Sequence, residues 1–194
     1  MIRQHVLLDS DGVLLDWEQG LQTWMAQEHP HLSNPSHYDE HAFELSLRYN
    51  ISRELGNQLV WDFHNHVEFT RLHPLPRSQQ AVSKLAQKFH LVVITACGVD
   101  QQIQEYRKQN LINCFGDVFE KIICVNRSVD KAVFLKSYPS SYWVEDHATN
   151  ANMGSDLGHE SFLVDAPYNV NKFVSPRVRR VADLAEAAEI ILAQ

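Results

Sequence analysis

Short apolar runs rich in β-branched and aromatic residues recur along the chain, and segments of helical character separate them. The runs occupy residues 6–8, 91–94, 122–125, 142–144 and 162–164. Their near-continuous hydrophobicity is typical of strands that are covered on both faces, as in a parallel sheet. Strands that alternate with helices form such sheets through crossover connections. The pattern therefore predicts an α/β fold with a Rossmann-like parallel sheet.

The composition agrees with one globular domain that carries an insertion. The chain has 194 residues, of which 44% are hydrophobic and 21% are charged, so it can bury a core. Its formal net charge of −7 and the lack of a Lys/Arg run argue against a nucleic-acid polymer as partner. No stretch of the sequence approaches the roughly 18 apolar residues of a membrane span. We expect a small phosphorylated substrate, for the reasons below, and leave the oligomeric state open.

Cysteine usage and the N-terminus bear on the compartment. Cys97, Cys114 and Cys124 are odd in number and lack the spacing of metal ligands, so we expect reduced thiols. The N-terminus runs directly into the first apolar run, without a basic region and an apolar signal core. Both features predict a cytoplasmic protein.

The connection between the first two apolar runs is much longer than one crossover helix requires. We interpret residues 16–76 as an inserted helical subdomain, hereafter the insert, and residues 1–15 and 77–194 as the core. The segment from Leu72 to Pro76, with Pro74 inside it, breaks the last helix and returns the chain to the sheet. Apolar residues at helical spacing fall into three groups in the insert: Leu21, Trp24 and Met25; Phe43 and Leu47; and Leu55, Leu59, Phe63 and Val67.

Helices are also predicted between and after the remaining runs. Asp100 and Asp130 are placed to accept hydrogen bonds from the first turns of two of them, the second expected over residues 131–136. An amphipathic closing helix is predicted at the C-terminus, from the spacing of Val181, Leu184, Ala185, Ala188 and Leu192.

Two aspartates one residue apart, Asp9 and Asp11, follow directly on the first apolar run. Carboxylates this close repel each other, which raises the pKa of at least one unless they share a cation or a proton. Oxygen ligands without nearby cysteine or histidine suit Mg²⁺, which takes further oxygens from a phosphorylated substrate. An acidic turn that only caps nearby backbone is the alternative. A calcium loop is excluded, because Leu14, Leu15 and Trp17 stand where it needs oxygen ligands.

The segment Asp9-Ser10-Asp11-Gly12-Val13 resembles the nucleophile motif of the haloacid dehalogenase (HAD) superfamily of phosphotransferases. The resemblance implies that Asp9 attacks phosphorus and forms an aspartyl-phosphate. It also implies that Asp11 acts first as general acid and then as general base. Mg²⁺ is then the expected cofactor, held by Asp9, the Asp11 carbonyl and an acidic residue from a later motif.

Two further motifs of that superfamily have counterparts in the chain. The second apolar run ends in Thr95-Ala96, and a hydroxyl and backbone N–H groups at a strand end can form an anion site. The resemblance implies that Thr95 and the Ala96 N–H bind the transferred phosphoryl group. Lys131 is similar to the lysine that neutralises the nucleophile and the phosphoryl oxygens, with Lys121 and Lys136 as rival candidates.

The run at residues 142–144 also ends on paired acids, Glu145 and Asp146, with Asn150 four residues beyond the pair. This arrangement resembles the fourth HAD motif, which completes the Mg²⁺ site. It implies that Asp146 is a metal ligand, and that Glu145 and Asn150 lie just outside the metal's own ligands. The motifs follow the order of the superfamily and span nearly the whole chain.

A narrower resemblance lies near the C-terminus. Phe162-Leu163-Val164-Asp165-Ala166-Pro167-Tyr168-Asn169, with Arg177 and Val181 beyond, is similar to a segment of the 5'(3')-deoxyribonucleotidases, and so is the return at Leu72-x-Pro74. That family carries a helical cap of the C1 type where this chain has its insert. The segment from Thr95 to Gly98 departs from that family's Thr-Ser-Pro-like sequence, which leaves the substrate open.

The sequence thus predicts a Mg²⁺-dependent phosphomonoester hydrolase of HAD type, acting on a nucleoside monophosphate. Aromatic residues of the insert could stack a nucleobase: Trp17, Trp24, Phe43, Trp61, Phe63 and Phe69. One alternative is a phosphatase or phosphomutase of a sugar phosphate or another small metabolite. A second, of another class, is a non-catalytic HAD-like binding module. Dehalogenation is disfavoured, because it needs no Mg²⁺-binding cluster of acids.

Overall fold

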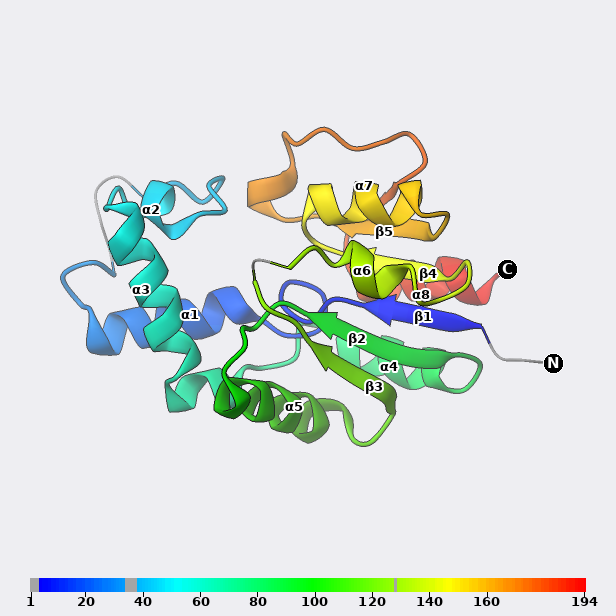
Figure 1. Ribbon diagram of the computed structural model, residues 1–194, viewed down its shortest axis with the longest axis horizontal. Helices are drawn as coiled ribbons and strands as arrows, with labels where there is room; N and C mark the ends of the chain where they lie inside the picture. Colours follow the sequence, from blue (N-terminus) through cyan, green and yellow to red (C-terminus); the bar gives the residue numbers. More distant parts are fainter. Residues whose placement is uncertain (1–3, 34–37, 128) are drawn as a thin grey trace.

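A computed structural model of the chain describes residues 4–33, 38–127 and 129–194. Its six strands form one parallel sheet in the order β3-β2-β1-β4-β5-β6 (Figure 1). The strands are β1 (His5–Leu8), β2 (His90–Thr95), β3 (Phe119–Cys124), β4 (Tyr142–Glu145), β5 (Glu160–Val164) and β6 (Arg179–Val181). The predicted α/β fold with a Rossmann-like parallel sheet is confirmed.

Helices connect the strands and cover both faces of the sheet. In the core they are α4 (Ser78–Ala86), α5 (Gln101–Phe115), α6 (Ala132–Leu135), α7 (Ala148–Asp156), the 3₁₀ helix η2 (Pro167–Asn169) and α8 (Leu184–Leu192). In the insert they are α1 (Trp17–Glu28), α2 (Leu45–Arg48), α3 (Arg53–His64) and the 3₁₀ helix η1 (Val67–Arg71).

Alternate residues of the central strands enter different parts of the core. Val6 and Leu8 of β1 pack into the larger apolar cluster, which includes residues of α4, α5 and α8. Leu7 packs on the other side, with Trp143 of β4 and Leu135 of α6. Burying one such aliphatic side chain stabilises the fold by roughly 1.5–3 kcal/mol. The apolar runs are therefore continuous because both faces of these strands need apolar side chains.

The C-terminal end differs from the prediction. Val181 belongs to the edge strand β6, and α8 begins only at Leu184. Asp183 marks the start of α8, because its side chain accepts a hydrogen bond from the Glu186 backbone N–H at 2.9 Å. A three-residue edge strand with arginine at two of its positions carries no apolar periodicity, so the pattern assigned Val181 to the helix.

The insert lies beside the carboxyl ends of the strands (Figure 1). Helical spacing predicted its long helices α1 and α3, and Asp16 accepts a hydrogen bond from the Gln19 N–H at 2.9 Å at the start of α1. The helix predicted to contain both Phe43 and Leu47 is shorter than expected. Only α2 is helical there; Phe43 precedes it, and both side chains are exposed, so burial did not cause their spacing. Similarly, α6 is shorter than residues 131–136.

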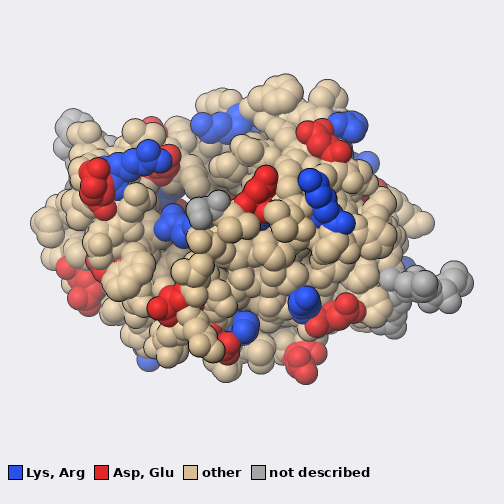
Figure 2. All heavy atoms as spheres, viewed as in Figure 1, with Lys and Arg blue, Asp and Glu red and all other residues tan. Residues whose placement is uncertain are grey.

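On the face of the molecule in Figure 2, lysine and arginine side chains are scattered among aspartate and glutamate. Among the helices formed by the described residues, none has the length and apolar character needed to cross a membrane.

Candidate functional site

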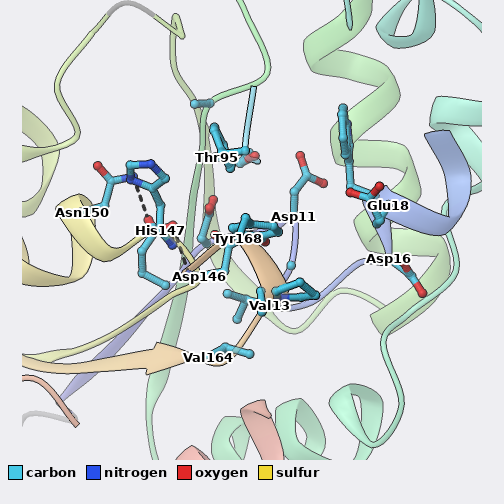
Figure 3. A pocket seen from close by; sticks show the side chains of 18 of the residues that line it. Asp11, Val13, Asp16, Glu18, Thr95, Asp146, His147, Asn150, Val164 and Tyr168 are labelled. Atoms are coloured by element: carbon cyan, nitrogen blue, oxygen red, sulfur yellow. Dashed lines mark hydrogen bonds between the residues drawn. The ribbon is translucent and has the colours of Figure 1, made fainter. Parts of the chain in front are cut away.

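A cavity of about 900 Å³ lies between the carboxyl edge of the sheet and the insert (Figure 3). All eight predicted catalytic, phosphate-binding and metal-site residues line it: Asp9, Asp11, Thr95, Ala96, Lys131, Glu145, Asp146 and Asn150. The rival lysines Lys121 and Lys136 are exposed elsewhere and do not line it. Residues of the insert, including Trp17 and Phe43, form the opposite wall. The structure thus brings the predicted site residues together from separate segments of the chain.

The turn after β1 places Asp9 and Asp11 at this edge. The Ser10 carbonyl accepts hydrogen bonds from the Leu14 and Leu15 N–H groups at 2.8 and 2.9 Å, which folds the chain sharply. Gly12 has a φ of 75°, and a Cβ there would lie 2.2 Å from the Asp146 Oδ2. Only glycine suits this position, because any side chain would be strained and would collide with that carboxylate.

Lys131 joins two of the acids. Its Nζ lies 2.9 Å from Asp9 Oδ2 and 2.9 Å from Glu145 Oε2, and its side chain is 5% exposed. Lys131 immediately precedes α6, and Asp130 Oδ1 accepts a hydrogen bond from the Ala132 N–H at 2.8 Å. Asp130 therefore orders the segment that carries the lysine. The buried ammonium supplies one positive charge to a site that holds several carboxylates.

Glu145 is fully buried and saturated with hydrogen bonds. Its Oε1 accepts from the backbone N–H groups of Asp146 and His147 at 3.2 and 3.1 Å, and Oε2 accepts from Asn150 Nδ2 at 3.2 Å. Burial alone would raise its pKa, but Lys131 and these hydrogen bonds lower the pKa of Glu145 to about 2. Glu145 is therefore ionised, and Asn150 contacts the cluster through it.

Asp9, Glu145 and Asp146 each offer a carboxylate oxygen, and these oxygens lie within 4.8 Å of one another. Burial raises the pKa of Asp9 and the pKa of Asp146, and the Glu145 charge raises both further. A cation between them would relieve this repulsion. The donor set consists of oxygen only, which fits Mg²⁺ better than zinc. Among the described residues this is the one such group of acids, histidines and cysteines.

Tyr168 and Asn169 hold Asp146 from the other side. The Tyr168 hydroxyl donates to Asp146 Oδ2, and Asn169 Nδ2 donates to the Asp146 carbonyl at 2.7 Å. Burial and the nearby Asp146 carboxylate raise the pKa of Tyr168, so the phenol stays protonated and remains a donor. The sequence indicated Tyr168 and Asn169 only through the resemblance of their segment to a nucleotidase, and the structure places both in direct contact with Asp146, a proposed metal ligand.

Arg107 is a site residue that the sequence reasoning missed. It lies on α5, is 0% exposed, and places Nη2 at 2.8 Å from Asp11 Oδ1 and 2.9 Å from Oδ2. Burial raises the pKa of Asp11, and the guanidinium charge opposes this shift. A signal existed: Ile103, Arg107 and Leu111 follow one another at i+4 spacing, which puts the arginine on the buried stripe of the helix.

No family model matches the sequence. An uncharacterized 32.4 kDa protein of Enterobacteria phage T4 is 26% identical over 165 residues, which is 80% of this chain and 58% of that protein. The chain thus spans little more than half the length of this relative.

Several solved structures are similar over nearly their whole length. A haloacid dehalogenase-like hydrolase from Streptococcus pneumoniae has a TM-score of 0.69 at 12% identity, covering 98% of this chain and 97% of that one. L-2-haloacid dehalogenase from Xanthobacter autotrophicus has 0.65 at 13%, covering 100% of both. D,D-heptose 1,7-bisphosphate phosphatase from B. bronchiseptica, complexed with magnesium and phosphate, has 0.61 at 15%, covering 98% of both.

These likenesses establish the fold. The chain has the HAD-like α/β fold, with its cluster of acids at the carboxyl edge of the parallel sheet.

Proposed function

We propose that the protein is a Mg²⁺-dependent phosphomonoester hydrolase that acts through an aspartyl-phosphate on Asp9. The observation that carries this proposal is the contact of Lys131 with both Asp9 and Glu145, beside the Asp146 carboxylate. A dehalogenase needs a nucleophilic aspartate, but it has no use for several buried carboxylates that repel one another. The magnesium and phosphate of the similar heptose bisphosphate phosphatase support the same choice.

The residues divide the reaction into two steps. In the first, an Asp9 carboxylate oxygen bonds to phosphorus, the bond from phosphorus to the ester oxygen breaks, and Asp11 gives that oxygen a proton. In the second, Asp11 takes a proton from water, the water oxygen bonds to phosphorus, and the Asp9–phosphorus bond breaks. Phosphate leaves and both carboxyl groups return to their starting states.

The surrounding groups hold the phosphoryl oxygens. Lys131, the Thr95 hydroxyl and the Ala96 N–H are the proposed partners of those oxygens as charge redistributes. Mg²⁺, with Asp9, the Asp11 carbonyl and Asp146 as its proposed protein ligands, would shield the negative charge of the phosphoryl group from the attacking carboxylate.

The insert, as a cap over the cavity, would choose the substrate, because the core residues contact only phosphate. We propose a nucleoside monophosphate, with Phe43 as the stacking platform. Trp24 and Phe69 are 2% and 0% exposed, so their faces are not free for a base. Trp61 is exposed but does not line the cavity, whereas Phe43 is 52% exposed and does.

A panel of phosphorylated metabolites tests the proposal. It contains nucleoside monophosphates, sugar phosphates and 4-nitrophenyl phosphate, each assayed with Mg²⁺ and again with chelator. Release of phosphate from at least one ester, with Mg²⁺ only, is expected. Phosphate release that is indifferent to chelator would contradict the metal assignment. No release from any ester would favour a binding module.

A further inference from the structure

Arg107 and Asp11 form a short ion pair. One nitrogen, Nη2, lies 2.8 Å from Oδ1 and 2.9 Å from Oδ2 of the same carboxylate. Nη2 donates its hydrogen bond to Oδ2, whereas Oδ1 is buried and accepts none from the described residues, so the contact fixes which oxygen of the carboxylate faces α5. The contact crosses from the α5 helix to the turn after β1, so two separate parts of the core meet at this pair.

The rest of the guanidinium has no comparable polar partner. Within the described part of the chain, Nε and Nη1 are buried without a hydrogen bond, and Asp11 is the only carboxylate paired with Arg107. One face of the guanidinium lies over the Phe69 ring, 4.1 Å from its centre. Phe69 is fully buried and stacks on His64, with ring centres 4.3 Å apart. This stack holds the arginine in place from the side of the insert.

Burying the Arg107 guanidinium with so few hydrogen bonds destabilises the fold. Burying an arginine costs several kcal/mol, which a single ion pair with incomplete hydrogen bonding offsets only in part. An apolar side chain on the same stripe of α5 would pack without that penalty. The buried charge therefore points to a task at Asp11 rather than to stability.

The proposed acid/base role of Asp11 requires a fixed position and orientation of its carboxylate. Asp11 precedes Gly12, its side chain is 27% exposed toward the cavity, and its carboxylate is not one of the three clustered acids. A proton donor works only when it lies within hydrogen-bond reach of its target, and misplacement by about 1 Å can lower a rate about a hundredfold.

We propose that Arg107 is a positioning residue, which holds the Asp11 carboxylate in the orientation from which it protonates the leaving oxygen. This inference rests on the proposed function. Arg107 is fully buried and is not among the residues that line the cavity, so it would not touch the phosphoryl group. Its effect on the reaction passes through Asp11, so it belongs to the proton-transfer part of the reaction.

The test is the leaving-group dependence of kcat/KM, which in a two-step mechanism reports the first step. Arg107→Met is compared with wild type on the best alkyl ester of the panel and on 4-nitrophenyl phosphate. The aryl ester has an acidic leaving group that needs little protonation. We expect a loss at least tenfold larger on the alkyl ester than on the aryl ester. Lys108→Met, which removes the neighbouring exposed cation of α5, should change neither value.

Two further variants test whether the effect of Arg107 depends on folding and on Asp11. If Arg107→Met does not fold by circular dichroism, Arg107→Lys keeps the charge, loses the planar group, and should show the same unequal losses. In an Asp11→Asn background, Arg107→Met should change kcat/KM for the aryl ester less than about twofold. Equal losses on the two esters would overturn the inference while leaving the phosphatase in place. A wild-type protein that hydrolyses no ester would instead overturn the proposed function.

Discussion

Lys131 Nζ lies at the same distance, 2.9 Å, from Asp9 Oδ2 and from Glu145 Oε2. One ammonium therefore faces two carboxylates that come from the ends of β1 and β4, neighbouring strands of the sheet. Two carboxylates share this single ammonium, and Asp146 adds a third acid beside them. The proposed Mg²⁺ would supply the positive charge that this group of acids lacks.

Asp9→Asn should abolish phosphatase turnover while the fold is retained. An amide has the shape of the carboxylate but cannot form the aspartyl-phosphate. We expect kcat to fall more than about a hundredfold, since loss of a nucleophile raises the barrier by several kcal/mol. Circular dichroism checks the fold, and Asp156→Asn, which removes an exposed carboxylate paired with Arg177, is the matched control. A variant that keeps more than about a hundredth of wild-type kcat would rule out Asp9 as nucleophile.

Asp146→Asn should weaken Mg²⁺ binding. The substitution keeps an oxygen at the position, but it removes one negative charge from the group that faces the cation. Calorimetric titration of the substrate-free protein with MgCl₂ should give a Kd at least about tenfold higher than that of wild type. Asp165→Asn is the control, because Asp165 lines the same cavity but is paired with Arg180. Unchanged Mg²⁺ affinity in Asp146→Asn would remove Asp146 from the proposed ligands.

The strand ends explain why much of this site could be predicted. Asp9, Thr95 and Glu145 each lie within one residue of the end of a buried strand, and parallel strands bring those ends to one edge. The position of each residue beside a strand end therefore indicated that the three lie close together in space.

Arg107 and Tyr168 reach the site differently. Arg107 enters from the middle of a helix, and Tyr168 from a 3₁₀ turn beyond the sheet. Their positions depend on how those elements pack, which no local pattern records. The free face of Phe43 was not predictable for the same reason, since its spacing with Leu47 suggested a buried helix.

His64 gives the unfolding free energy a specific pH dependence. Burial, assisted by the charges of Arg107 and Arg127, lowers the pKa of His64 from 6.5 to about 3. The neutral ring accepts a hydrogen bond from Trp17 Nε1 at 3.2 Å and contacts the Cys97 carbonyl through Nδ1 at 3.3 Å. The unfolded chain binds a proton at His64 below pH 6.5 and the folded chain does not until about pH 3. Acid therefore destabilises the fold across that window.

His64→Gln should flatten this dependence, because an amide offers a donor and an acceptor without titrating. Between about pH 4 and pH 6 the slope of the unfolding free energy against pH should decrease by about 1 kcal/mol per pH unit. Urea unfolding at several pH values measures it. The other buried groups titrate alike in both proteins, so the difference isolates His64. Parallel curves for the two proteins would mean that His64 has the same pKa in both states.

Phe43→Ala tests whether the nucleobase of the substrate stacks on Phe43. The Phe43 ring packs against His147 and Tyr168, with centres 4.9 and 5.4 Å away, so it sits at the junction of insert and core. Stacking contributes on the order of 1–3 kcal/mol per base. For some nucleoside monophosphate, kcat/KM in wild type should therefore exceed the value for ribose 5-phosphate by roughly tenfold or more. The alanine variant should lose most of that preference and keep its rate on ribose 5-phosphate.

Trp61→Ala is the matched control for this last experiment, because Trp61 is an exposed aromatic of the insert outside the cavity. It should leave the preference unchanged. If Phe43→Ala keeps the preference for the nucleoside monophosphate, the base does not stack on Phe43. Trp17, which also lines the cavity, would then be the candidate for the stacking ring. Equal rates of wild type on ribose 5-phosphate and on every nucleotide would mean that the base is not recognised. The nucleotide assignment would then fall, and the phosphatase assignment, which rests on Asp9, Lys131 and their neighbours, would stand without it.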